Sequence, residues 1–189
     1  TVATMVTGPP RGLHARLRPF SAGGGVRAVT VISMCLIAPW NAPLAHGVNP
    51  ELALNGSYAA VSVGNWAKTN EVYIDEQVVR SIWTIVSSCS DPDNCVGHVH
   101  SDQGWDAEIS MKANMWSVRR DIPNWIPCPD GTAYPGRQLF RFAPAGPGGR
   151  RVVGSPVLAG EDVTAGPAGA CGVGQPLVIR MPFRLDKIS

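Results

Sequence analysis

From residue 56 onwards, apolar and polar side chains alternate along the chain with a period of two. The clearest run lies near the C-terminal end, where every second residue from Leu177 to Leu185 is apolar. Such alternation is typical of strands that bury one face. Helical periodicity is almost absent after residue 47. The pattern therefore predicts an antiparallel all-β domain.

About eight strands are expected, joined by turns rich in Gly, Pro, Asn and Asp. Segments 144–149 and 165–174 hold too much Gly and Pro for regular structure and should be surface loops. The simplest topology is an antiparallel meander, either closed into a barrel or folded into a two-sheet sandwich. We favour the barrel because closure removes exposed strand edges. The expected strands cover residues 56–63, 79–87, 95–101, 105–112, 115–120, 138–143, 152–158 and 177–186.

Residues 1–47 have a different pattern. Four arginines precede or open the apolar run at 26–40, and Ala45-His46-Gly47 follows as a small-x-small cleavage site. These features are typical of a secretory signal peptide. We expect cleavage near Gly47, one domain at 48–189 and no permanent membrane anchor. An uncleaved anchor is the alternative. Lipidation at Cys35 is disfavoured because Met34 before it is not small.

Charge argues against a nucleic-acid partner. The whole chain has 16 basic and 14 acidic residues, but four of the basic residues and none of the acidic ones lie in residues 1–47. The segment 48–189 thus carries 12 basic and 14 acidic residues, a net charge of −2. Nucleic-acid-binding domains normally carry a basic excess. We expect a monomeric domain that acts outside the cell or in the cell envelope.

Four cysteines follow the leader, and an even count in an exported chain indicates disulfides with three possible connectivities. Cys89 and Cys95 flank the turn-rich insert 90–94, which should bring them together. We therefore pair Cys89 with Cys95, and Cys128 with Cys171 as the remaining pair. A structural zinc site is disfavoured because C-x5-C with two lone cysteines does not have the usual ligand spacing.

Several segments resemble a group of small exported mycobacterial proteins of unknown function that share four cysteines. A thinner likeness, to the extracellular sensor domains of mycobacterial serine/threonine kinases, rests on an aromatic strand that ends in two nearby cysteines and on a last cysteine before a Pro-Phe strand. The resemblance implies export, disulfides and an all-β domain, and it supplies no catalytic residues. No kinase portion is present here, so signalling is not implied. The segments that carry it are WTIVSSCSDPDNCVG at 83–97, SDQGW at 101–105, DIPNWIPCPDGT at 121–132 and GACGVGQPLVIRMPFRL at 169–185.

His98, His100 and Asp102 alternate along one predicted strand and so share a face. His-x-His can bind zinc or copper, but three same-face residues on one strand span about 13 Å. They cannot easily converge on one ion, and a further ligand would have to be a carboxylate from a neighbouring strand. We therefore predict a polar solvated face and no metal. A metal-dependent or hydrolytic enzyme using this strand is the weaker alternative, since no G-x-S-x-G motif accompanies it.

Two tryptophans are candidates for partner or ligand binding. Trp125 lies in a proline-stiffened loop before Cys128, and rigid loops that carry tryptophan often form recognition surfaces. Trp66 completes a G-x-W triplet like that of lipocalin barrels, which carry apolar ligands. Packing is the competing interpretation for both, as a cap on the core for Trp125 and as core or barrel-end packing for Trp66.

The sequence thus predicts an exported, non-enzymatic binding module without a cofactor. Its partner would be a protein, an envelope component or a small apolar ligand inside the barrel. The alternative is a structural or antigen-like secreted domain without a pocket. Large residues at inward positions, such as Trp83, Phe140 and Phe183, indicate little internal room.

Overall fold

The computed structural model describes residues 51–189; the predicted signal peptide, its cleavage site and Cys35 lie outside this range. Within it the chain forms β-strands and three short 3-10 turns, η1 (Gly64–Trp66), η2 (Pro147–Gly149) and η3 (Ala170–Gly172). The strands are β1 (Gly56–Ser62), β2 (Lys68–Thr69), β3 (Val72–Tyr73), β4 (Val79–Asp91), β5 (Asn94–Ser101), β6 (Trp105–Lys112), β7 (Met115–Pro127), β8 (Ala133–Pro144), β9 (Val157–Ala165) and β10 (Val178–Lys187).

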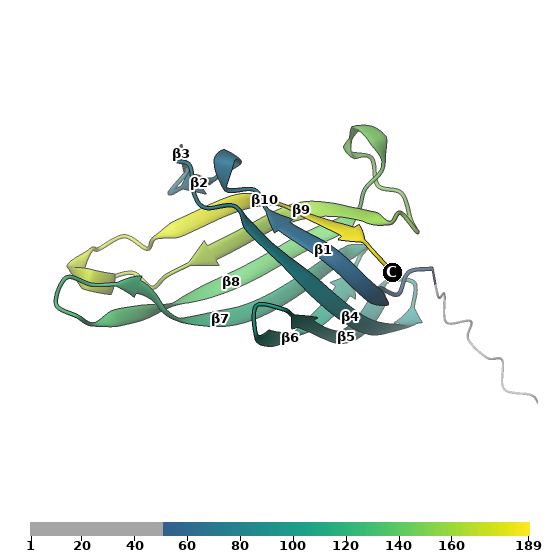
Figure 1. The fold of residues 1–189 in the computed structure, drawn as a ribbon, viewed down its shortest axis with the longest axis horizontal. Coiled ribbons are helices and arrows are strands. Elements are labelled where there is room, and N and C mark those ends of the chain that lie inside the picture. The colour runs from purple at the N-terminus through teal and green to yellow at the C-terminus, as the bar shows by residue number, and fades with distance from the viewer. Residues whose placement is uncertain (1–50) are drawn as a thin grey trace, which may run out of the picture. The chain divides into compact units, whose positions relative to one another are not determined.

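Eight of these strands close into an antiparallel barrel in the order β1-β4-β5-β6-β7-β8-β9-β10 (Figure 1). Pairing of β1 with β10, from Tyr58 opposite Lys187 to Ser62 opposite Phe183, closes the cylinder. The prediction of a closed meander is confirmed, and the sandwich alternative is wrong. The short β2–β3 hairpin pairs with β10 and projects from the wall beside the barrel.

One predicted strand is misplaced. Residues 152–158 were expected to be extended, but β9 begins only at Val157. Gly154 has a φ of 76°, and the Ser155 amide donates to the carbonyl of Val152, so a turn interrupts the run. Pro156 follows this turn and lacks an amide hydrogen for a ladder. Val152 and Val153 are consequently exposed.

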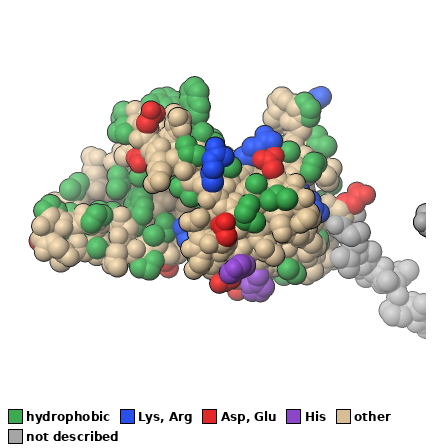
Figure 2. All heavy atoms as spheres, viewed as in Figure 1, with side chains coloured by type: hydrophobic (Ala, Val, Ile, Leu, Met, Phe, Trp, Pro, Cys, Tyr) green, Lys and Arg blue, Asp and Glu red, His purple; other side chains and the backbone are tan. Residues whose placement is uncertain are grey.

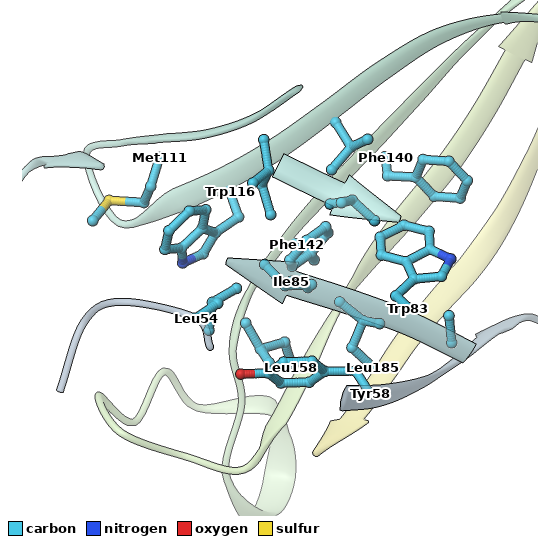
Figure 3. Packing of buried hydrophobic residues seen from close by; sticks show 14 of the residues in the cluster. Leu54, Tyr58, Trp83, Ile85, Met111, Trp116, Phe140, Phe142, Leu158 and Leu185 are labelled. Atoms are coloured by element: carbon cyan, nitrogen blue, oxygen red, sulfur yellow. The ribbon is translucent and has the colours of Figure 1, made fainter. Parts of the chain in front are cut away.

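The inward faces of the strands carry the predicted apolar residues. Trp83 lies at the centre, with the Phe140 ring centroid 4.9 Å away and that of Phe183 5.2 Å away. These edge-on and tilted ring contacts contribute interaction energy in addition to that of the apolar area that each ring buries. The core therefore fills the barrel from wall to wall. Figure 3 shows Leu54, Tyr58, Trp83, Ile85, Met111, Trp116, Phe140, Phe142, Leu158 and Leu185 packed together inside it.

Two inward-facing glycines allow neighbouring strands to approach closely. A Cβ built on Gly160 of β9 would lie 1.9 Å from the carbonyl oxygen of Arg141 on β8. A Cβ on Gly97 of β5 would lie 2.2 Å from the carbonyl oxygen of Val86 on β4. Glycine at a strand interior often marks such a bend. These two positions therefore let the sheet curl enough to close.

Both predicted disulfides are present. Cys89 and Cys95 are directly opposite partners on β4 and β5, and their bridge lies buried in the core. Cys128–Cys171 connects the end of β7 to η3. The β7–β8 hairpin extends beyond the other strands (Figure 1). This second bridge therefore fixes the projecting hairpin to the β9–β10 connection.

Candidate functional site

The segment between β1 and β4 presents the most exposed aromatic side chains of the described residues. It leaves β1 through Gly64, where a Cβ would lie 2.0 Å from the carbonyl oxygen of Glu76, so the two ends of the segment touch. The Gly64 carbonyl accepts hydrogen bonds from the amides of Ala67 and Glu76. Ala67 is buried beneath the turn. Trp66, on the turn's other side, is held outward by this framework.

Trp66 is 67% exposed. The interpretation of this residue as core or barrel-end packing is therefore wrong. The neighbouring Ala67 is buried instead, and the larger indole lies in solvent. Its predicted role in binding stays a prediction.

The β2–β3 hairpin continues this surface. Asn70 and Glu71 both have positive φ, 47° and 67°, as a two-residue type I′ turn requires. Tyr73, opposite Lys68, is 69% exposed, and the Lys68 ammonium lies 4.8 Å from the centre of its ring. The hairpin is anchored because the Asn70 amide donates to Val178 and its side chain accepts from the Val178 amide.

A groove of about 580 Å³ runs between this segment and the outer face of β9 and β10. Its volume falls in the range of small-molecule sites, roughly 300–1,000 Å³. Arg180 of β10 lies in it, with its guanidinium 3.1 Å from the Glu71 carboxylate and 3.8 Å from that of Glu161. We call it the Trp66 groove. It is lined by Trp66, Lys68, Glu71, Tyr73, Gly160, Glu161, Arg180, Met181 and Pro182. Figure 2 shows hydrophobic side chains gathered on the β2–β3 projection, next to charged ones.

A second polar feature lies inside the barrel, where β7, β8 and β9 meet. The Asp162 carboxylate, only 1% exposed, accepts hydrogen bonds from the Ser62 hydroxyl at 2.7 Å and from the Gln138 amide at 2.8 and 2.9 Å. The Gln138 oxygen in turn accepts from Arg120 Nε at 2.6 Å. Arg120 also stacks on the Trp105 ring, 4.4 Å from its centre. Every buried side-chain polar atom in residues 51–189 has a partner.

Burial dominates the protonation equilibria of this network. Loss of solvent raises the pKa of Asp162, an effect that its two hydrogen-bond donors and the Arg120 charge partly oppose. Burial likewise lowers the pKa of Arg120, against the influence of Asp162. The recess beside these residues measures only about 80 Å³. That is far below the volume of a typical ligand site, so the recess leaves no room for an apolar ligand.

Trp125 is half-buried and lies within β7, on the projecting β7–β8 hairpin, so its predicted position in a loop is wrong. Its indole lies over Gly136, where a Cβ would approach it to 2.6 Å, and near Gly166. It thus packs on the hairpin and its neighbour, outside the main core cluster. Partner binding by Trp125 stays a prediction.

His98 and His100 lie exposed on the outer face of β5, as the alternation predicted. His100 Nδ1 is 2.8 Å from the Asp106 carboxylate on β6, while His98 is opposite Glu108. Asp102 lies in the turn beyond β5. Figure 2 shows the histidines beside acidic side chains. Within residues 51–189 no three His, Cys, Asp or Glu side chains form a metal-binding group.

Sequence reasoning did not identify Asp162, Gln138, Tyr73 or Arg180. Asp162 belongs to an alternating run in which Leu158 and Thr164 also face inward, so its burial follows from the strand phase once the start of β9 is known. Tyr73 belongs to a strand of two residues, which is too short to show a period.

Comparison with known proteins supports the fold. No family model matches the chain, and none of the curated proteins is significantly similar to it. Among solved structures, the monomer form of the PknI sensor domain of M. tuberculosis is similar, with a TM-score of 0.51 and 17% identity over 72% of this chain and 88% of that one. The likeness to kinase sensor domains is thus confirmed as a shared fold. No finding bears on the group of small exported four-cysteine proteins.

Among residues 51–189, no helix combines the length and hydropathy that a transmembrane span needs.

Proposed function

We propose that this chain is an exported, non-enzymatic binding module that attaches to a component of the cell envelope through the Trp66 groove. The observation that carries the proposal is the pair of aromatic side chains, Trp66 and Tyr73, which are more than two-thirds exposed on a rigid segment. Exposed apolar side chains gathered on one surface mark interaction sites more often than scattered ones do.

Hydrogen bonds hold the segment that carries Trp66 and Tyr73 in one conformation. The Glu76 amide donates to the Gly64 carbonyl and so holds the two ends of the segment together, while the Asn70 amide fastens the hairpin turn to Val178. The Thr69 hydroxyl also donates to the Glu76 carboxylate at 3.0 Å. A surface that is already ordered loses little conformational entropy when it binds. Tryptophan and tyrosine on such a surface are frequent sources of binding energy.

The shared fold of the PknI sensor domain is compatible with a binding or sensing role, although fold alone does not determine function. Export is part of the proposal and rests on the signal peptide expected at residues 1–47. We expect the secreted species to begin close to Val48, which intact-mass measurement of culture supernatant tests. A secreted form that retains Arg27 would contradict the cleavage site.

The envelope interaction can be tested with isolated mycobacterial cell walls that have been treated with protease. We expect them to retain the full chain. Trp66→Ala and Tyr73→Ala should each reduce retention at least tenfold. Both side chains are largely exposed, so neither change removes core packing.

Tyr134→Ala is the matched control, because Tyr134 is an exposed aromatic residue of β8 outside the groove. It should leave retention unchanged. Equal retention of all three variants, or no retention of the parent chain, would contradict the proposal. Either result would favour the alternative of a structural or antigen-like secreted domain.

A further inference from the structure

We propose that the ligand of the Trp66 groove is a neutral saccharide. This inference rests on the proposed function and narrows it to one class of envelope component. It follows from three properties of the groove: its aromatic surfaces, its balance of hydrogen-bonding groups and the backbone conformation of Glu71.

The aromatic surfaces fit the apolar faces of sugar rings. A pyranose presents a patch of C–H groups on each face, and the negative face of an aromatic ring attracts such slightly positive hydrogens. Trp66 and Tyr73 both line the groove and both are largely in solvent. Lys68 already lies over the Tyr73 ring. The larger Trp66 ring therefore offers the main stacking surface.

The polar groups select a ligand that both donates and accepts hydrogen bonds. Lys68 and Arg180 bring donors only, and Glu71 and Glu161 bring acceptors only. The four charges sum to zero. Sugar hydroxyls can pair with both kinds of group at once, and a neutral molecule disturbs neither the Arg180–Glu71 nor the Arg180–Glu161 pair.

Other occupants fit less well. A proline-rich peptide also stacks on tryptophan and tyrosine, but proline lacks an N–H, so such a peptide offers few donors to the two carboxylates. A lipid surface would have to desolvate Glu71 and Glu161. A polyanion such as nucleic acid would find no net positive charge in the groove. The saccharide is therefore the occupant that the groove favours.

Glu71 provides an independent observation. Its φ of 67° is a left-handed conformation in which glycine and asparagine are preferred at a type I′ turn. A side chain with a Cβ adds strain here, and strained positions cluster at binding sites. At this position the chain has a carboxylate that reaches Arg180 in the groove, although a glycine would make the better turn.

The test uses the full secreted chain, with its tryptophan indoles labelled with nitrogen-15, and four neutral tetrasaccharides: maltotetraose, cellotetraose, tetra-N-acetylchitotetraose and an arabinofuranose tetramer. At least one should shift the Trp66 indole resonance in a saturable way. Tyr73→Ala and Glu161→Gln should each weaken that binding at least fivefold. Calorimetry should show at least a tenfold loss for Trp66→Ala, and Tyr134→Ala should bind as the parent does.

Two comparison ligands sharpen the result. A sulfated tetrasaccharide and a proline-rich decapeptide should leave the Trp66 resonance in place. The saccharide inference is overturned if the decapeptide shifts the Trp66 resonance. It is also overturned if none of the four neutral tetrasaccharides shifts it. If cell walls still retain the chain in a Trp66-dependent manner, the proposed function survives that result. If retention does not depend on Trp66, the proposed function itself fails.

Discussion

At the scale of single residues, the most consequential side chain is a carboxylate in an apolar interior. Asp162 is almost fully buried, and its three hydrogen bonds come from uncharged donors, while the nearest positive charge, Arg120, reaches it through Gln138. A buried ionised side chain normally needs an oppositely charged partner and hydrogen bonds to replace the water it has lost. The network therefore offsets the cost of burial without abolishing it, which is why the pKa of Asp162 remains raised.

This raised pKa gives a pH dependence whose sign can be worked out. A carboxyl group whose pKa is higher in the folded than in the unfolded state binds protons more tightly when folded. The free energy of unfolding should thus rise as pH falls from the raised value towards 3.8, by about 1.4 kcal/mol for each unit of the pKa increase. In Asp162→Asn this contribution should disappear.

Urea unfolding of both proteins between pH 3.5 and pH 8 measures the difference. The parent chain should gain stability relative to Asp162→Asn on acidification. If the parent chain instead lost stability relative to Asp162→Asn on acidification, the folded state would prefer the ionised form of Asp162. The charge of Arg120 would then outweigh the effect of burial on the pKa of Asp162.

At the scale of elements, the β2–β3 hairpin combines a strained turn with a charged side chain. Glu71→Gly should raise the free energy of unfolding by about 1 kcal/mol, because relief of the left-handed conformation exceeds the loss of an exposed ion pair. Urea unfolding is the measurement. Glu71→Gln retains the strain and removes the charge, so this control should show no gain. A Glu71→Gly protein less stable than the parent would indicate that the Arg180 pair matters more than the turn.

The curvature of the sheet depends on Gly160, and Gly160→Ala should lower the free energy of unfolding by about 3 kcal/mol. Its Cβ would overlap the carbonyl oxygen of Arg141, which can move only if β8 and β9 separate. Gly174→Ala, whose Cβ meets open space, should stay within about 0.5 kcal/mol of the parent. Equal effects of the two substitutions in thermal unfolding would show that close approach at Gly160 is unimportant.

How far the sequence predicts these elements depends on their length and on the residues at their ends. The run that ends at Leu185 has enough alternation to set its phase, and Met181, Phe183 and Leu185 are buried as expected. Val152 and Val153 look like strand residues, but the turn at Gly154–Pro156 removes them from the sheet. The Trp66 groove could not be predicted, because Tyr73 and Arg180 are more than one hundred residues apart and meet only through the β2–β10 pairing.

At the scale of the whole molecule, the barrel is a filled cylinder, and the proposed binding surface lies on its outside. Trp83, Phe140 and Phe183 occupy the space that a lipocalin-like barrel would offer to a ligand. Native mass spectrometry of the protein from its own host should therefore show the mass of the processed chain without a retained lipid. A co-purified apolar molecule that is released only on unfolding would show that the interior can open.

The seam between β1 and β10 has a consequence for how the chain is made. These are the first and last strands of the barrel, so Tyr58 finds its partner Lys187 only after almost the whole domain has emerged from the ribosome. Until then β1 and β9 both present open edges, which invite association with other chains. Pairings so distant in sequence also form slowly, on a scale of milliseconds to seconds. Closure of the cylinder is therefore a late step in folding, because the barrel stays open until its last strand is available to pair with its first.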